Sequence, residues 1–174
     1  MEQGPQMQKI HGLARCLLCA AFFASSHAAA GNPIQTENAK VGTTEWKPAK
    51  PGYASQVIEG FASAASVNVA GSIKLFVNTK EPSYAIDVFR TGYYGGTGAR
   101  RMLPTISRTG IAQPPCPMDP ATGLIECNWI NPYVLGIPGD WVAGFYIAKL
   151  TSGSTGTNQY ILFVVREATF SVPH

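Results

Sequence analysis

The segment best equipped to bind a ligand or a partner is rich in glycine, tyrosine and arginine and spans residues 92–101. Its glycines permit positive φ angles and close backbone approach. The simplest interpretation is a glycine-rich turn packed by its own tyrosines. The alternative is a docking or ligand-binding surface, in which apolar aromatic area is combined with positive charge. Its candidate residues are Arg90, Tyr93, Tyr94, Arg100 and Arg101.

A phosphate-binding loop is not indicated here, because such a loop ends in Gly-Lys-Ser/Thr and opens a helix. Catalysis by a serine triad is equally unsupported, since no serine stands in a Gly-x-Ser-x-Gly elbow. Two of the three histidines, His11 and His27, precede residue 31, and His174 is the last residue. The carboxylates are scattered singly along the chain. We therefore expect no catalytic residue, no metal site and no cofactor.

The N-terminal residues 1–30 have the order of features that is typical of a cleavable signal peptide. Lys9 and Arg15 are basic, residues 16–24 form an apolar run, and small residues follow up to Ala30. A membrane-spanning helix needs about 20 apolar residues, so this run is too short for an anchor. We expect cleavage after Ala28 or after Ala30, and a secreted or periplasmic protein.

Export changes the interpretation of the four cysteines. Cys16 and Cys19 would leave with the signal peptide, whereas Cys116 and Cys127 would remain as a pair in an oxidising compartment. A disulfide between them is expected, and closing this loop contributes on the order of 2 to 3 kcal/mol. Two buried free thiols are the alternative. Two cysteines and a terminal histidine are too few ligands for zinc.

The composition limits the fold and the partners. The chain has 174 residues, of which 13% are charged, with a formal net charge of +3, 18 Gly and 13 Pro. So few charges and so many turn residues disfavour coiled coils and helix bundles. No run of basic residues is long enough to attract a polyanion, so nucleic acid is not an expected partner. The length fits one ordinary domain.

The elements that position these residues are predicted to be strands. Residues 31–55, rich in proline, glycine and lysine, are expected to form an extended leader. Residues 56–167 consist of short apolar runs separated by turn residues, which indicates an all-β domain of the antiparallel immunoglobulin- or fibronectin-like sandwich type. Residues 168–174 would be a short divergent tail. The predicted strands are 57–62, 66–69, 72–79, 84–91, 100–106, 124–130, 144–151 and 159–166.

The alternation of apolar residues predicts which side chains face the core. Both faces of 159–166 are apolar, so this strand is expected in the middle of a sheet. Trp141 is expected to plug the edge of the core rather than to bind a ligand. The predicted inward side chains are Ile73, Leu75, Val77, Tyr84, Ile86, Val88, Tyr146, Ala148 and Leu150.

Several blocks resemble the β-sandwich region of N,N-dimethylformamidase large (beta) subunit-like proteins. They are IEGFAS at 58–63 with SVN at 66–68, IDVFRTGYYGGTGAR at 86–100, TGLIECNW at 122–129 and DWVAGFY at 140–146. The resemblance runs from about residue 57 to Glu167 and implies an N-terminal accessory sandwich. In the characterised amidohydrolase of the family, a larger catalytic region follows and holds iron through tyrosine and glutamate side chains. No position here corresponds to that region.

The sequence thus predicts an exported, non-catalytic accessory module that ends before the catalytic region. Its expected partner is a protein or that missing region, with no nucleic acid and no membrane once the signal is cleaved. The main alternative is a freestanding secreted module that binds carbohydrate or peptide through Tyr93, Tyr94, Trp129 or Tyr133. An intact small hydrolase is the third hypothesis.

Overall fold

The computed structural model describes residues 1, 4, 31–49 and 56–167. The chain divides into two units, Met1–Ala30 and Gly31–His174, and residues 31–49 and 56–167 belong to the second. The predicted signal peptide and the predicted tail lie outside the described residues. Among the described residues, no helix is long and apolar enough to cross a membrane.

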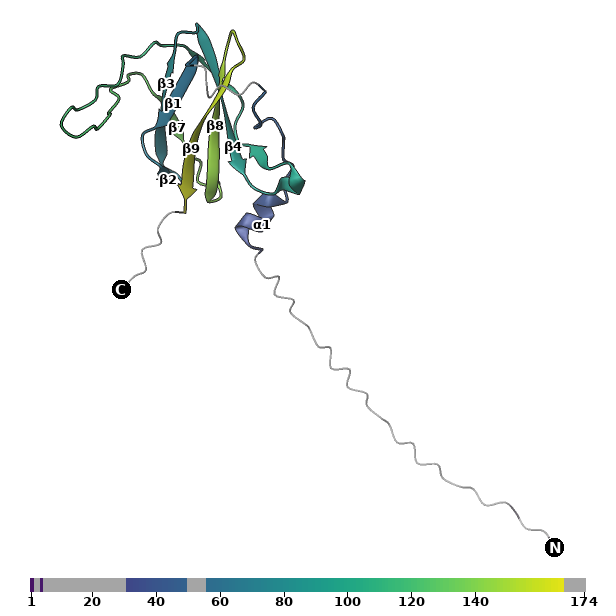
Figure 1. Ribbon diagram of the computed structural model, residues 1–174. Helices are drawn as coiled ribbons and strands as arrows, with labels where there is room; N and C mark the ends of the chain where they lie inside the picture. The colour runs from purple at the N-terminus through teal and green to yellow at the C-terminus, as the bar shows by residue number, and fades with distance from the viewer. Residues whose placement is uncertain (2–3, 5–30, 50–55, 168–174) are drawn as a thin grey trace, which may run out of the picture. The chain divides into compact units, whose positions relative to one another are not determined.

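The described chain is all-β, as predicted, with two short helical elements (Figure 1). One sheet has three strands in the order β1-β3-β7, and the other has six, in the order β2-β9-β8-β4-β5 with β6 also paired to β4. The strands are β1 (Ile58–Ala62), β2 (Ser66–Asn68), β3 (Ser72–Thr79), β4 (Ser83–Thr91), β5 (Ala99–Arg101), β6 (Ile106–Thr109), β7 (Tyr133–Gly136), β8 (Gly144–Ser152) and β9 (Asn158–Arg166).

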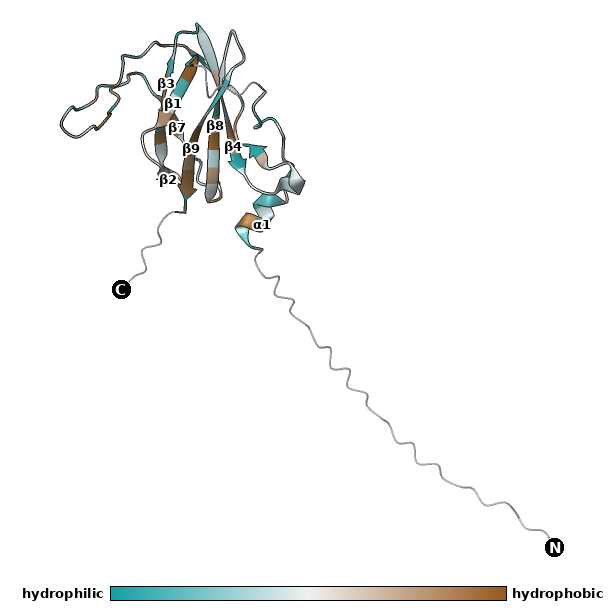
Figure 2. Cartoon of the chain, viewed as in Figure 1, coloured by the Kyte–Doolittle hydropathy of each residue, from teal (hydrophilic) through white to brown (hydrophobic). Residues whose placement is uncertain are grey.

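Side chains from both sheets form one hydrophobic core. Hydrophobic segments follow the strands that supply it (Figure 2). All the predicted inward side chains are buried, because alternate residues of a strand face the same side of its sheet. In β3 the pattern is strict, since Ile73, Leu75 and Val77 are buried whereas Lys74 is exposed.

The turn that enters β8 closes one edge of this core. The Tyr146 hydroxyl donates to the carbonyl oxygen of Val142 at 2.7 Å. Trp141 stacks on the Tyr146 ring with 4.9 Å between centroids, and Phe163 packs near the same ring at 5.7 Å. Burial raises the pKa of Tyr146, so its hydroxyl stays a donor. Trp141, 8% exposed, is a plug at the core edge, as predicted.

Strand β9 lies between β8 and β2, which confirms its predicted place inside a sheet. It pairs antiparallel with β8 and parallel with β2, where Ser66 lies opposite Val164. Its outward face is not covered along its whole length, because Leu162 is 67% exposed.

Two predicted strands were wrong. The stretch 100–106 is divided into β5 and β6, because four residues between Arg101 and Ile106 lie opposite only two residues of β4, and Pro104 cannot donate to the ladder. The stretch 124–130 forms no strand, and only an isolated bridge pairs Ile125 with Met118. The four-residue β7 was missed because prolines flank it on both sides.

Residues 31–49, predicted as an extended leader, instead begin with the helix α1 (Pro33–Asn38). The Asn32 side chain accepts from the Ile34 amide at 2.9 Å, and Pro33 occupies the first helical position, a combination that starts a helix. Six residues are too few to show a helical hydrophobic period, so sequence patterning could not reveal this element. We call residues 33–49 the strap.

The strap continues over the outward face of the six-stranded sheet. The Lys149 ammonium, on the side of β8 opposite the core, donates to the carbonyl oxygens of Glu45 at 2.8 Å and Lys47 at 2.9 Å. The Tyr160 hydroxyl donates to the Trp46 carbonyl at 2.6 Å. The strap is therefore an integral part of the fold.

Candidate docking surface

The glycine-rich loop follows β4 and contains the 3-10 turn η1 (Tyr94–Gly96). Tyr94 has a φ of 41° and Gly98 a φ of 92°. A side chain at Gly98 would lie 2.9 Å from the Trp46 ring, so glycine is required there both for its backbone angle and for close packing. This backbone turns the two tyrosines apart, since Tyr94 is 2% exposed and Tyr93 is 72% exposed.

Glu37 is the centre of a buried polar network that joins the strap to this loop. Its carboxylate accepts from the Tyr94 hydroxyl at 3.0 Å, from Arg100 at 2.7 Å and from Lys40 at 2.7 Å. Burial alone would raise the pKa of Glu37, but the hydrogen bonds from Lys40, Arg100 and Tyr94 and the charge of Arg100 together lower it. Glu37 is therefore an anion that is buried but well partnered.

Arg90 is also buried, and its guanidinium faces the same network. It donates to the Tyr94 hydroxyl at 3.0 Å and to the Asn38 side-chain oxygen at 3.1 Å. It also donates to the carbonyl oxygens of Val142 at 3.3 Å and Ala143 at 3.0 Å. Arg90 thus joins the strap, the loop and the entrance to β8.

Arg101 has a similar structural role on the outward face. Its guanidinium is paired with Asp87 and with Glu45 of the strap, and it lies 5.0 Å from the centroid of the Phe89 ring. Thr105 is hydrogen-bonded to both Arg101 and Asp87, which stabilises the break between β5 and β6.

The structure brings Arg90, Tyr94 and Arg100 together around Glu37, whereas Arg101 lies on the outward face with Asp87 and Glu45. Arg90 and Tyr94 are buried and cannot form a docking surface as proposed from the sequence, and Arg100 and Arg101 are paired with carboxylates of the strap. Tyr93 alone among the five predicted surface residues presents an open aromatic ring. The prediction failed because the strap supplies Glu37 and Glu45, whose positions the sequence pattern did not reveal.

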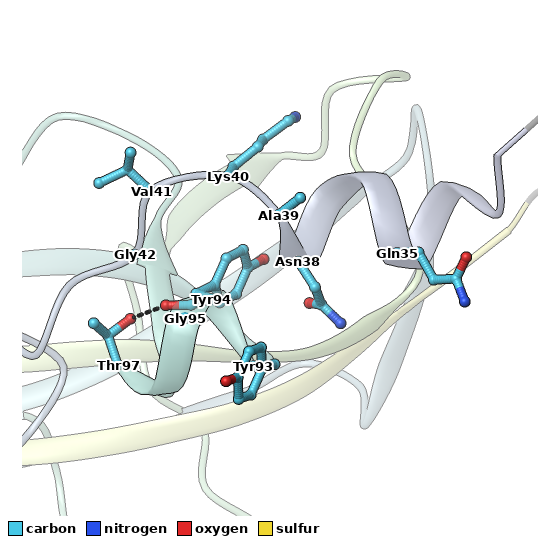
Figure 3. Close-up of a pocket in the computed structure, with 10 residues that line it drawn as sticks. All are labelled: Gln35, Asn38, Ala39, Lys40, Val41, Gly42, Tyr93, Tyr94, Gly95 and Thr97. Carbon is cyan, nitrogen blue, oxygen red and sulfur yellow. Dashed lines mark hydrogen bonds between the residues drawn. The ribbon is translucent and has the colours of Figure 1, made fainter.

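An open groove of about 660 Å³ lies between the strap and the glycine-rich loop (Figure 3). Its lining is mainly apolar, and the side chains at its edges include Val41, 90% exposed, and Tyr93. Figure 3 shows Tyr94 between Val41 and Tyr93 in this view, with Lys40 extending from the strap. The groove is preformed, because the Glu37 network fixes both of its walls.

A second exposed apolar area lies on the outward face of the six-stranded sheet. Phe145 pairs with Val164, and Leu162 pairs with Ile147, so Phe145 and Leu162 are diagonal neighbours on one face. Each is 67% exposed. Sequence reasoning noted that both faces of β9 are apolar but did not identify this patch.

A third exposed area is the hairpin closed by the predicted disulfide. Cys116 and Cys127 are joined, with 4.4 Å between their Cα atoms, which confirms the pairing. Within it, Met118 lies opposite Ile125, and both side chains are about 60% exposed. Trp129 packs on Phe61 at the hairpin stem. Among the described residues, no group of three or more metal-ligating side chains was found.

The family assignment rests on a sequence match that begins in β4 and includes the glycine-rich loop and the disulfide hairpin. A sequence model of the family described as "N,N-dimethylformamidase beta subunit-like, C-terminal" matches residues 85–172, from β4 through β9 and the glycine-rich loop. Among curated proteins, none matches the chain. The match covers half of the chain and confirms the resemblance to the family. The matching model is described as C-terminal, so the expected N-terminal position of this region within the family's proteins is not supported, and the N-terminal limit of the shared region stays a prediction. The chain therefore belongs to the N,N-dimethylformamidase beta subunit-like family.

Proposed function

We propose that this chain is an exported, non-catalytic β-sandwich module that docks on a partner protein through the groove beside Tyr93. The observation that carries the proposal is the exposure of Tyr93 at the edge of a preformed apolar groove. Apolar area of this kind, held on a rigid frame, is typical of interaction sites. The buried Glu37 network supplies the rigidity.

An immunoglobulin-like sandwich is supported by the order of the strands. Strands β1, β3 and β7 take the places of strands A, B and E, and β4, β8 and β9 take those of C, F and G. In addition, the hydrogen bond from Tyr146 to the Val142 carbonyl resembles the tyrosine corner found near the start of strand F.

Export is supported by the signal-like pattern of residues 1–30 and by the disulfide, since such bonds persist mainly in oxidising compartments. The proposed location is therefore the periplasm or the cell exterior. The proposed partner is the catalytic region of an N,N-dimethylformamidase-like protein.

The docking proposal is tested by titrating the full chain with a purified catalytic region of such a protein in a calorimeter. Tyr93→Ala should weaken binding about tenfold because it removes apolar contact area. Val41→Asp should have a similar effect because it places in the contact a charge that must lose its hydration. Val134→Ala, an exposed position on the edge strand β7, is the matched control and should bind like the unaltered chain. Equal binding by all variants would contradict the role of the groove.

The non-catalytic proposal is tested separately by incubating the chain with N,N-dimethylformamide and iron salts. No dimethylamine should be released above the rate without protein. Turnover that scales with protein concentration would overturn this part of the proposal and favour a small hydrolase.

A freestanding carbohydrate-binding module is the second candidate, favoured by the open ring of Tyr93, which could stack on a sugar. A glycan array should then show saturable binding that Tyr93→Ala abolishes. Binding that survives this substitution would exclude the groove as a sugar site.

A further inference from the structure

One edge of the six-stranded sheet is formed by β6, which pairs with β4 on one side. Among the described residues, no strand pairs with β6 on its other side. Just after β6 the Gly110 amide donates to the Pro82 carbonyl, and hydrogen-bonded positions alternate along an antiparallel pair. Arg108 is therefore bonded to β4, whereas the amides and carbonyls of Ser107 and Thr109 point away from the sheet.

The outward backbone groups of Ser107 and Thr109 are accessible to a partner. Both residues are exposed, and the hydrogen bonds found among the described residues engage neither the amides nor the carbonyls of this pair. A row of unpaired N–H and C=O groups is a template for another strand. Its chemistry calls for an extended segment, which presents a donor and an acceptor at alternate residues.

The strap shows how a segment is held on the neighbouring part of the same edge. Strands β5 and β6 both pair with β4. At β5 the Thr43 amide donates to the Ala99 carbonyl at 2.8 Å. Two residues further along the strap, Glu45 forms an ion pair with Arg101 of β5. A backbone hydrogen bond and a carboxylate–guanidinium pair thus act together at β5.

The same two kinds of group are available at β6, where Arg108 supplies the guanidinium. Arg108 is exposed, lies 5.6 Å from the centroid of the Tyr133 ring and interacts with the Tyr84 hydroxyl. Neither aromatic contact neutralises its charge, and among the described residues Arg108 forms no ion pair. A guanidinium positioned in this way favours a carboxylate, with which it forms strong charge-assisted hydrogen bonds.

A mainly polar pocket of about 410 Å³ lies beside Arg108. In an added antiparallel strand, the side chain directly opposite Arg108 shares the face of Arg108, so it would lie at this pocket. The Asn131 side chain offers a further hydrogen-bond donor there. The pocket is lined by Ser107, Arg108, Thr109, Ile111, Asn131 and Pro132.

We propose that the β6 edge binds an extended segment of a partner protein as an added antiparallel strand, with an aspartate or glutamate opposite Arg108. The backbone groups of Ser107 and Thr109 hold the segment, and Arg108 selects its charge. A second copy of this chain is disfavoured, because two-fold pairing of Ser107 with Thr109 places Arg108 opposite Arg108 of the second copy. This surface is separate from the groove beside Tyr93 and does not depend on docking there.

The test measures binding of a synthetic peptide to the full chain by fluorescence anisotropy. The probe is the peptide Thr-Val-Thr-Glu-Thr-Val-Thr, amidated at its C-terminus and labelled with an uncharged fluorophore, because its residues favour an extended conformation. The unaltered chain should bind this peptide with a Kd below about 1 mM. Glutamine in place of the peptide's glutamate should weaken binding about tenfold. Methylation of alternate peptide amides should abolish binding, because it removes the donors of the ladder.

Variants of β6 test the backbone and the charge separately. Ser107→Pro removes an outward amide but no bond to β4, and proline is tolerated on edge strands in such positions. It should abolish peptide binding, whereas Ser107→Ala keeps the amide and is the matched control. Arg108→Glu should weaken binding of the glutamate peptide at least tenfold, and a peptide with lysine in that place should recover it. Circular dichroism checks that each variant is folded.

Absence of peptide binding to the unaltered chain up to about 1 mM would overturn the proposal. So would equal binding by Ser107→Pro and Ser107→Ala, or undiminished binding of the methylated peptide. A dimer that analytical ultracentrifugation detects, and that Ser107→Pro abolishes, would assign this edge to a second copy instead. Tyr93→Ala should bind the peptide like the unaltered chain, and a loss of binding would place the peptide in the groove and contradict a separate surface.

Discussion

The strap and glycine-rich loop differ from the disulfide hairpin in how each uses its polar and apolar side chains. Around Glu37, charged groups are buried and paired with one another, and they join segments that are more than 50 residues apart in sequence. In the hairpin, a covalent bond and local hydrogen bonds hold the backbone while apolar side chains remain exposed. Most of the residues that the sequence suggested for binding thus have structural roles, whereas exposed apolar side chains lie in a hairpin for which the sequence predicted a disulfide and a strand.

The largest expected effect is the loss of the buried carboxylate. Glu37→Ala should lower the free energy of unfolding by about 3 kcal/mol, because Arg100 and Tyr94 lose their partner inside the protein. Glu45→Ala removes a carboxylate that is 61% exposed and should cost less than about 1 kcal/mol. Urea unfolding measures both values. Equal effects would mean that the Glu37 network does not hold the strap.

Removal of the disulfide should have the next largest effect. Replacing both Cys116 and Cys127 with serine should lower the free energy of unfolding by about 2 to 3 kcal/mol, since the unfolded chain gains entropy. Hydrogen exchange should also accelerate at the amides of Asp119 and Gly123, which are bonded within the hairpin. Unchanged exchange would show that local hydrogen bonds alone maintain its shape.

A smaller effect is expected from acid. The folded-state pKa of Glu37 lies below its ordinary value of 4.5, so its contribution to stability is complete above that pH and is lost as pH falls through the folded-state pKa. The difference in urea midpoint between the unaltered chain and Glu37→Gln should therefore shrink as the pH decreases below about 4.5. A difference independent of pH would contradict an ionised Glu37.

The smallest changes in the free energy of unfolding are expected from substitutions of the two adjacent tyrosines. Tyr94→Phe removes a hydroxyl that bonds Arg90 and Glu37 and should cost about 1.5 kcal/mol. Tyr93→Phe, at an exposed position, should change stability by less than about 0.5 kcal/mol. Thermal unfolding of the two variants checks whether only the buried hydroxyl contributes to stability. A similar loss for both would place Tyr93 in the folded network as well.

Local patterns predicted much of the framework. Strands β3, β4, β8 and β9 were found because each spans eight or nine residues rich in β-branched, aromatic and other apolar side chains and is bounded by turn residues. Failures occurred where partners outside the segment decide the conformation. The apolar residues of 124–130 satisfy strand propensity, but no neighbouring strand pairs with them along their length. The helix α1 depends on a cap and on contacts of Glu37 rather than on a hydrophobic period.

The candidate site was predicted less well than the framework, and for the same reason. Sequence proximity grouped Arg90, Tyr94 and Arg100, which do meet around Glu37. It could not show that Arg101 lies on the outward face, or that Glu37 and Glu45 of the strap reach these arginines. The patch of Phe145 and Leu162 was hidden because an apolar residue on the outward face of a strand looks the same in sequence whether or not another segment covers it.

By itself the sequence determined the strand periods, the inward residues of the core, the cysteine pair and the family. These depend on alternation along a strand and on short-range spacing, both of which can be recognised within a short stretch of sequence. Only the tertiary structure decided that Tyr94 is buried and Tyr93 exposed, and that carboxylates of the strap pair with Arg100 and Arg101. The physical reason is that burial and charge pairing are properties of distant segments brought together, and one segment alone does not contain its partner.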